Sequence, residues 1–299
     1  MPPETSAEQL RFLPGDAVVR VVPADAIPEH PGRGDILVPH VGRKRRHELL
    51  KRLEGLRVVQ TLSAGVDGYL LDIPDGVTLC DARGVHDISV SEWVVAAILA
   101  MQRDLPQYVR DQANSTWKPA EGYAREVHGM HVLILGHGSI GQAVAQRLQP
   151  FGATVTGIAL HPREDAHGIE DLGALLPQAD AVVVLLPLTE RTRGMIDTSF
   201  IERMKPGALL VNAGRGGVAD TRAIATAVQQ GRIRAALDVV DPEPLPAEHP
   251  LWRAGEVLLT PHIAGTTEGF LDRAWQFVGE QVRRYIDGEP LLNVVREGY

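Results

Sequence analysis

The feature that most restricts the fold is a regular alternation of short apolar runs and helix-like segments from residue 131 onward. Apolar runs this continuous are typical of strands buried on both faces of a parallel sheet, with helices as the crossovers. The alternation therefore predicts a doubly wound parallel-sheet α/β domain. The expected strands are His131–Leu135, Ala153–Ile158, Ala181–Leu186, Ala208–Asn212, Arg234–Val239 and Glu256–Thr260, and the expected helices are Ile140–Leu148, Ile169–Leu176, Asp197–Met204 and Asp220–Gln230. Between Val239 and Glu256, four prolines predict a crossover loop without a helix.

The rest of the chain predicts a second, smaller α/β unit. Its expected strands are Val18–Val22, Ile36–Val38, Val58–Leu62 and Val77–Cys80, with helix-compatible stretches such as Lys44–Glu54 between them. Ser91 is expected to cap a helix over Ser91–Arg103 that leaves this unit. Apolar residues at helical spacing over Thr267–Ile286 predict a last helix that returns to it. We therefore expect one domain at 93–266 and a discontinuous one at 1–92 and 267–299; 299 residues suit two domains.

Composition excludes several classes of function. A net charge of −8 disfavours nucleic-acid binding and binding to an anionic membrane. The longest apolar run, Trp93–Met101, is shorter than the ~18 residues of a membrane span, and we expect no signal peptide and a soluble protein. The single cysteine, Cys80, predicts neither a disulfide nor a metal cluster and fits a cytoplasmic location.

A glycine-rich turn, GHGSIG at Gly136–Gly141, follows the first strand of the larger domain and opens a helix. Gly136 permits a tight turn, Gly138 lets the backbone approach a pyrophosphate, and Gly141 permits close packing of helix on strand. The helix N-terminus at Ser139 and Ile140 supplies backbone N–H groups for an anion. The context favours dinucleotide binding over a purely structural turn.

The second strand of such a unit usually ends in an acid that binds the adenosine ribose. Here it is followed by Ala159, Leu160, His161, Pro162 and Arg163. Because His161 and Arg163 could attract a 2′-phosphate, we expect NADP to be used at least as well as NAD. The alternative is that Arg163 is a solvated loop cation and the site accepts either cofactor.

Side chains that could take part in catalysis follow three later strands. An Arg can hold a carboxylate and polarise a carbonyl, a His can transfer a proton, and a Glu beside the His favours its protonated form. Arg215, His262 and Glu243 satisfy these requirements and suit hydride transfer to a 2-oxo acid. Each has an alternative interpretation: a surface turn residue, a structural histidine and an exposed loop charge. Asp238 either caps the following turn or faces the nicotinamide.

Several motifs resemble, in type and order, those of the D-isomer-specific 2-hydroxyacid dehydrogenases, a family that includes glyoxylate/hydroxypyruvate reductases and phosphoglycerate dehydrogenases. The resemblance extends over nearly the whole chain. Its motifs are SAGVD at Ser63–Asp67, the Gly136–Gly141 turn, LPLT at Leu186–Thr189, VNAGRG at Val211–Gly216, LDV at Leu237–Val239 with Glu243–Pro244, PLW at Pro250–Trp252 and TPHIAG at Thr260–Gly265.

The resemblance implies an enzyme with a Rossmann nucleotide domain, a smaller flavodoxin-like substrate domain and an active site in the cleft. It implies that Arg215 binds the substrate carboxylate and carbonyl, that His262 is the acid/base paired with Glu243, and that Asp238 lies near the nicotinamide. Backbone at Ala64 and Gly65 would bind the substrate carboxylate, together with Arg215 and His262. The remaining cofactor-binding residues it implies are Leu186, Pro187, Ala213, Arg215, His262 and Gly265.

The resemblance also implies a homodimer, with Ser91–Gly122 near its interface. The chain departs from the family pattern at two places. The acid after the second strand is missing, which argues against strict NAD specificity. Glu243 stands where formate dehydrogenases have a glutamine, which argues against formate as the substrate. The expected function is interconversion of a small 2-oxo acid and its D-2-hydroxy acid by NAD(P)H. The alternative is a dinucleotide-sensing regulatory protein that keeps the fold.

Overall fold

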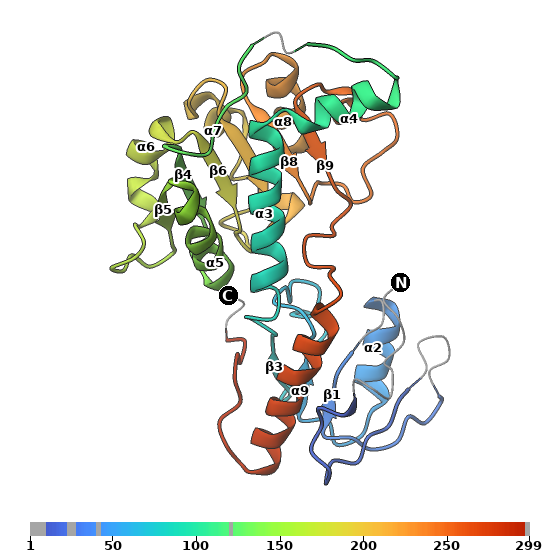
Figure 1. The fold of residues 1–299 in the computed structure, drawn as a ribbon. Helices are drawn as coiled ribbons and strands as arrows, with labels where there is room; N and C mark the ends of the chain where they lie inside the picture. Colours follow the sequence, from blue (N-terminus) through green and yellow to red (C-terminus); the bar gives the residue numbers. More distant parts are fainter. Residues whose placement is uncertain (1–9, 23–27, 40–42, 120–121, 297–299) are drawn as a thin grey trace. The chain divides into compact units, whose positions relative to one another are not determined.

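The chain divides into two compact units, as Figure 1 shows. The computed structural model describes residues 10–22, 28–39, 43–119 and 122–296. Met1–His86 and Thr267–Tyr299 belong to unit 1, and Asp87–Thr266 form unit 2. The boundary expected between residues 92 and 93 falls inside helix α3, Asp87–Gln102. The division precedes this helix because its buried side chains, such as Val94 and Ile98, pack in a core of unit 2.

Unit 2 is built on a six-stranded parallel sheet with the order β5-β4-β6-β7-β8-β9. A single parallel bridge from Ile158 to His167 lies beyond β5, where a further strand would begin. The doubly wound parallel-sheet fold predicted from the apolar runs is confirmed. The strands are β4 (His131–Leu135), β5 (Thr154–Ile158), β6 (Ala181–Val184), β7 (Leu209–Asn212), β8 (Arg234–Leu237) and β9 (Val257–Leu259).

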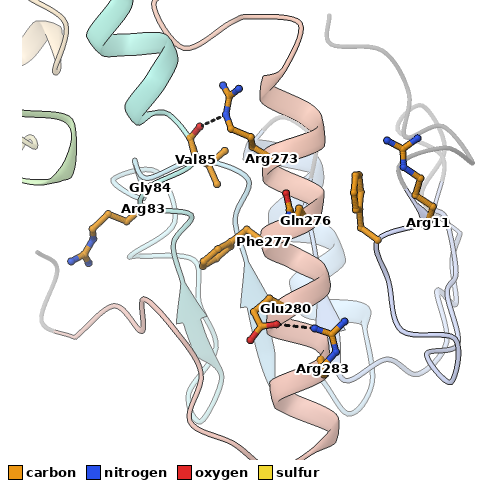
Figure 2. A pocket seen from close by; sticks show the side chains of 10 residues that line it. Arg11, Arg83, Gly84, Val85, Arg273, Gln276, Phe277, Glu280 and Arg283 are labelled. Carbon is orange, nitrogen blue, oxygen red and sulfur yellow. Dashed lines mark hydrogen bonds and ion pairs between the residues drawn. The ribbon is translucent and has the colours of Figure 1, made fainter. Parts of the chain in front are cut away.

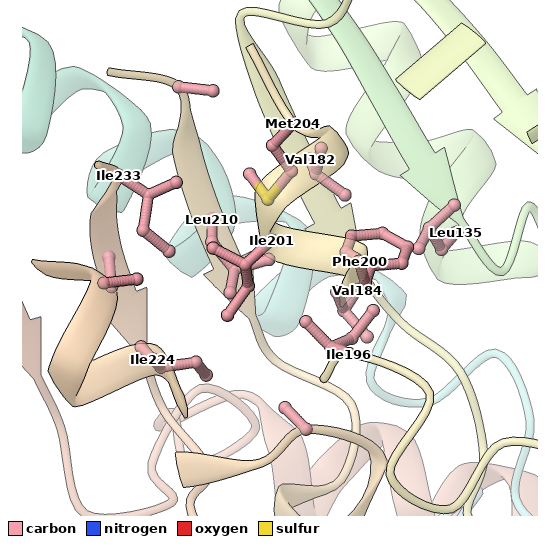
Figure 3. Packing of buried hydrophobic residues seen from close by; sticks show 14 of the residues in the cluster. Leu135, Val182, Val184, Ile196, Phe200, Ile201, Met204, Leu210, Ile224 and Ile233 are labelled. Atoms are coloured by element: carbon pink, nitrogen blue, oxygen red, sulfur yellow. The ribbon is translucent and has the colours of Figure 1, made fainter. Parts of the chain in front are cut away.

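Helices cover both faces of this sheet. In β6, Val182 and Val184 point to one core and Val183 to the other, as the two-residue period of a strand requires. Figure 3 shows the first core, where Phe200 packs beside Val184. The helices are α3, α4 (Leu105–Ala113), α5 (Ser139–Leu148), α6 (Leu172–Leu175), α7 (Thr198–Arg203) and α8 (Thr221–Gln229), with 3-10 turns η1 (Gln149–Phe151), η2 (Ile169–Asp171), η3 (Leu176–Gln178), η4 (Gly216–Val218) and η5 (Pro250–Arg253).

Several helix ends differ from the expected ones. Ser91 was expected at the cap of α3 but lies inside it, buried, and its hydroxyl donates to the Asp87 and Ile88 carbonyls. The expected helix Ile169–Leu176 is divided into η2, α6 and η3. The segment between β8 and β9 contains only the turn η5, which agrees with its prolines.

The described part of unit 1 is a smaller parallel α/β structure. Its strands β1 (Ile36–Leu37), β2 (Val58–Gln60) and β3 (Thr78–Cys80) pair in that order, and its helices are α2 (Arg43–Arg52) and α9 (Phe270–Ile286). Helix α9 begins at Phe270 rather than at Thr267, and it packs Trp275 and Val278 against Leu62. The chain after α9 returns to β3, where Val294 pairs with Cys80.

The strand expected at Val18–Val22 is wrong. These residues have no strand assignment, and the Val18 side chain is fully exposed. A β-branched run forms a strand only where a neighbouring strand and a buried face accept it, and this run has neither in the described structure.

Candidate active site

The glycine turn between β4 and α5 packs closely against the end of β6. Gly136 has a φ of +98°, and a Cβ there would lie 2.8 Å from the Leu185 carbonyl oxygen. A Cβ at Gly141 would lie 2.6 Å from the Gly136 carbonyl oxygen. Only glycine fits both positions. Gly138 is the N-cap residue of α5, and no side chain caps the first backbone N–H groups of this helix. The turn therefore presents the start of α5 to an anion.

Two neighbouring turns meet this one at the same edge of the sheet. The Leu185 N–H donates to the Leu135 carbonyl at 2.8 Å, and the Ala213 N–H donates to Val184 at 3.2 Å. A Cβ at Gly214 would lie 2.8 Å from the Leu186 carbonyl oxygen. The expected cofactor-binding residues Gly136, Leu186, Pro187 and Ala213 thus lie at the carboxyl ends of β4, β6 and β7, where ligands bind in open α/β sheets.

Arg215 is positioned by a buried asparagine that the sequence analysis did not single out. The Asn212 side chain accepts from the Gly214 N–H at 3.1 Å and donates to the Arg215 carbonyl at 3.3 Å. The Arg215 guanidinium donates to the Gly214 carbonyl at 2.8 Å, and the residue is half-buried. Asn212 therefore fixes the turn that carries Arg215. A polar residue ending an otherwise apolar strand is the signal that could have revealed it.

Glu243 and His262 lie together. His262 Nδ1 is 3.0 Å from Glu243 Oε2, a distance at which a ring N–H donates to the carboxylate. The other carboxylate oxygen, Oε1, accepts from the Val240 N–H at 3.1 Å. The carboxylate is thus held by backbone on one side and by the imidazole on the other. Ring nitrogen Nε2 is not used in this contact.

Asp238 holds the loop that carries His262. Its carboxylate is buried and accepts from the Thr260 hydroxyl at 2.6 Å and from the Ile263 and Ala264 N–H groups at 2.8 and 2.9 Å. The His262 N–H donates to the Asp238 carbonyl at 2.8 Å, and His262 has a φ of +55°. Both oxygens of Asp238 are engaged by the loop, which continues to Gly265; a contact of Asp238 with nicotinamide stays a prediction.

Arg215, Asp238 and His262 follow the adjacent parallel strands β7, β8 and β9. They therefore occupy one edge of the sheet. Ala64 and Gly65 belong to unit 1, in the bend after β2, where the Ser63 hydroxyl donates to the Gly65 carbonyl at 3.1 Å. Their substrate-binding role stays a prediction.

The two basic residues after β5 differ in their surroundings. His161 is exposed, whereas the Arg163 guanidinium donates to Asp165 at 2.6 Å and to the His137 carbonyl. His137 is buried within the turn, and burial lowers the pKa of its ring. The hydrogen bond from Arg163 lowers the pKa of Asp165. Nothing in the sequence marks Asp165 as a partner of this turn.

A separate cavity of about 660 Å³ lies in unit 1, along α9 (Figure 2). Its arginines already have protein partners: Arg273 donates to the Val85 carbonyl at 3.1 Å, and Arg283 pairs with Glu280 at 2.8 Å. None of the expected site residues lines it. We therefore assign it no part in the candidate site.

Two features are absent from the residues that the structure describes. Within them, no three His, Cys, Asp or Glu side chains are grouped so that they could hold a metal ion. None of the helices in these residues has the length and apolar character needed to cross a membrane.

Comparison with known proteins assigns the larger unit. Residues 95–264 match the family model described as D-isomer specific 2-hydroxyacid dehydrogenase, NAD binding domain. The chain belongs to this family. The region matched lies within unit 2, which carries the glycine turn, Arg215, Glu243 and His262. The family resemblance predicted from the motifs is confirmed.

The similar proteins include reductases and dehydrogenases of known structure. A D-isomer specific 2-hydroxyacid dehydrogenase from Xanthobacter autotrophicus, solved with NADPH and MES, is 31% identical, with a TM-score of 0.83 and coverage of 97% of this chain and 93% of that one. An NADPH-dependent glyoxylate/hydroxypyruvate reductase from Sinorhizobium meliloti, solved with NADP and sulfate, is 29% identical, with a TM-score of 0.79 and coverage of 89% and 86%.

D-3-phosphoglycerate dehydrogenase from Methanocaldococcus jannaschii is 33% identical over 270 residues, which are 87% of this chain and 51% of that protein. The chain spans about half the length of the phosphoglycerate dehydrogenases that it matches.

Proposed function

We propose that this protein is an NAD(P)-dependent oxidoreductase that interconverts a small 2-oxo acid and its D-2-hydroxy acid, as glyoxylate and hydroxypyruvate reductases do. The observation that carries the proposal is the 3.0 Å contact between His262 Nδ1 and Glu243 Oε2, at the sheet edge that also bears Arg215. Family membership and the likeness to an NADPH-dependent glyoxylate/hydroxypyruvate reductase support it.

The roles follow from the chemistry of the side chains. Arg215 binds the substrate carboxylate through its two-pronged guanidinium and polarises the neighbouring carbonyl. His262 donates a proton from Nε2 to the carbonyl oxygen during reduction, while Glu243 holds the ring in place through Nδ1. Asp238 keeps the His262 loop in place. The bound nicotinamide supplies the hydride.

The residues present fit a dinucleotide. The start of α5 supplies backbone N–H groups for its pyrophosphate, and the Cβ position of Gly138 has no other described group within 4 Å beyond its chain neighbours, which leaves the backbone there open to a ligand. We propose that Gly138, Ser139 and Ile140 contact the pyrophosphate and that NADPH serves at least as well as NADH. Arg163 is the cation that would meet a 2′-phosphate, and His161 would assist it.

Activity of a histidine variant tests this function. NADPH or NADH oxidation is followed at 340 nm with glyoxylate, hydroxypyruvate and pyruvate. His262→Gln should lower turnover ~10²–10⁴-fold and leave cofactor affinity nearly intact, because only proton transfer is lost. His131→Gln is the matched control. His131 begins β4, at the amino ends of the strands and away from the candidate site, and its ring forms a hydrogen bond with the Thr156 hydroxyl of β5. Loss of this imidazole should leave turnover unchanged.

Two outcomes would overturn the proposal. Equal turnover by His262→Gln and the unchanged protein would remove His262 from the mechanism. Tight cofactor binding with no turnover across a wide panel of 2-oxo acids would favour the dinucleotide-sensing protein.

We also propose that a second copy of the chain covers α4 and the segment after it. Helix α4 has no buried residue, and Val109, Trp117 and Tyr123 expose 63%, 97% and 104% of their reference surface. Residues 120 and 121 of the expected interface segment lie outside the described residues. Sedimentation equilibrium should give a dimer mass, and a monomer at micromolar concentration would contradict this.

A reducing cytoplasm is the location we propose for a chain with one buried thiol.

A further inference from the structure

The loop after β5 turns back onto the glycine turn. Arg163 and Ala166 exchange two backbone hydrogen bonds of 2.9 and 3.0 Å, which closes residues 163–166 into a tight turn. The chain then rejoins the sheet, because the Ala159 N–H donates to the His167 carbonyl and the His167 N–H donates to Gly157, both at 2.9 Å. This path carries Asp165 back toward the start of α5.

Two side chains hold Asp165 there by hydrogen bonds, and a third lies close to it. Its Oδ1 accepts from Arg163 Nε at 2.6 Å, and its Oδ2 accepts from Gln142 Nε2 at 2.9 Å. His137 Nε2 lies 3.6 Å from Oδ2. Gln142 belongs to α5, and His137 lies between the first two glycines of the turn. The carboxylate that is absent from the end of β5 is therefore supplied seven residues later, beside the dinucleotide-binding turn.

This arrangement gives Arg163 a competing partner. In a dinucleotide-binding unit the adenosine ribose lies at the end of the second strand, which here is β5. A 2′-phosphate would need the guanidinium that Asp165 already engages, and it would meet the negative charge of Asp165. A free 2′-hydroxyl meets no such repulsion, and a carboxylate can accept a hydrogen bond from it.

We propose that Asp165 is a specificity-determining residue that limits the affinity for 2′-phosphorylated dinucleotides and keeps the site open to both NADPH and NADH. The inference rests on dinucleotide binding by the proposed function, but not on the reaction that follows. His137 does not offset the carboxylate at neutral pH, because burial lowers the pKa of its ring. The balance between Arg163 and Asp165 then decides between the two cofactors.

The experiment measures binding by isothermal titration calorimetry with NADPH, NADH and 2′,5′-ADP, without any substrate. Asp165→Asn keeps the shape and removes the charge. In a water-like dielectric, a carboxylate about 5 Å from a phosphate dianion weakens binding of the phosphate by about ten-fold through charge repulsion. We therefore expect NADPH and 2′,5′-ADP to bind about ten-fold more tightly to Asp165→Asn, with NADH affinity within two-fold. Asp171→Asn, which removes an acid that pairs with His167 and not with Arg163, is the control for net charge.

A second variant tests the competition itself. Arg163→Gln should weaken binding of 2′,5′-ADP, and it should weaken it more in the Asp165→Asn background, where the guanidinium is no longer shared. The 47% exposure of the Asp165 side chain makes its replacement compatible with folding, and retained NADH binding reports the fold. Unchanged NADPH affinity in Asp165→Asn, or an equal change for NADH and NADPH, would overturn the inference. A chain that shows the expected selectivity but reduces no 2-oxo acid would refute only the proposed function.

Discussion

Asp238→Asn tests whether a buried carboxylate organises the loop that carries His262. The side chain is 3% exposed and accepts three hydrogen bonds, of 2.6, 2.8 and 2.9 Å. An asparagine in the same place keeps an acceptor for Thr260 and Ile263, but its NH₂ group then faces the Ala264 N–H, donor against donor. A lost charged hydrogen bond and a buried, unpaired N–H together cost about 2–4 kcal/mol.

The expected loss of stability is measurable by scanning calorimetry. For a unit of this size, 2–4 kcal/mol lowers Tm by roughly 5–15 °C. Asp220→Asn is the matched control: Asp220 caps α8 by accepting from the Arg222 and Ala223 N–H groups but is exposed, and asparagine caps helices as well as aspartate does. Its Tm should change by no more than about 2 °C, because the cost of a conservative cap replacement is a few tenths of a kcal/mol.

Hydrogen exchange then locates the effect. The left-handed conformation of His262, with φ at +55°, costs a non-glycine residue about 1–2 kcal/mol and persists only where the surroundings impose it. Without the Asp238 carboxylate, amides of residues 260–266 should exchange faster than in the unchanged protein. The same Tm loss in both variants, together with unchanged exchange over 260–266, would refute the reasoning.

Two further predictions concern titratable groups. Burial raises the pKa of the Cys80 thiol to about 11, so Ellman's reagent at pH 8 should react with it slowly in the folded chain and rapidly in urea; equally fast reaction in both would contradict its burial. Burial lowers the pKa of His137 from 6.5, so the unfolded chain binds a proton there that the folded chain does not, and the free energy of unfolding should fall as pH drops below about 6.5. His137→Phe should reduce this loss in urea titrations between pH 5 and 7.5, and an unchanged pH dependence would count against the assignment.

Much of the fold could be predicted because the strands of unit 2 are buried on both faces. A run such as Ala181–Val184 has no alternative environment that satisfies four apolar side chains in a row. Helix ends were less predictable. Ser91 has the chemistry of a cap, but its hydroxyl bonds within the helix because α3 begins earlier, at Asp87. The strand expected at Val18–Val22 failed because β-propensity needs a neighbour.

The candidate site was likewise only partly predictable from the sequence. The order of motifs along the chain predicted Glu243 and His262 as a pair, and the structure brings the two side chains within 3.0 Å. Asn212 and Asp238 were visible as polar residues at strand ends, but their hydrogen bonds to the Arg215 turn and the His262 loop were not. Asp165 carried no signal of its own, because its meeting with Gln142 depends on the path of a turn.

By itself, the sequence determined that unit 2 would be a parallel α/β sheet with its candidate catalytic side chains at the carboxyl ends of the strands. The period of apolar residues and the glycine turn are local, and local patterns decide which faces are buried. Only the tertiary structure decided which carboxylate meets which cation or N–H group. Such contacts form at distances of about 3 Å between residues far apart in the chain, and loop paths, not periodicity, set those distances.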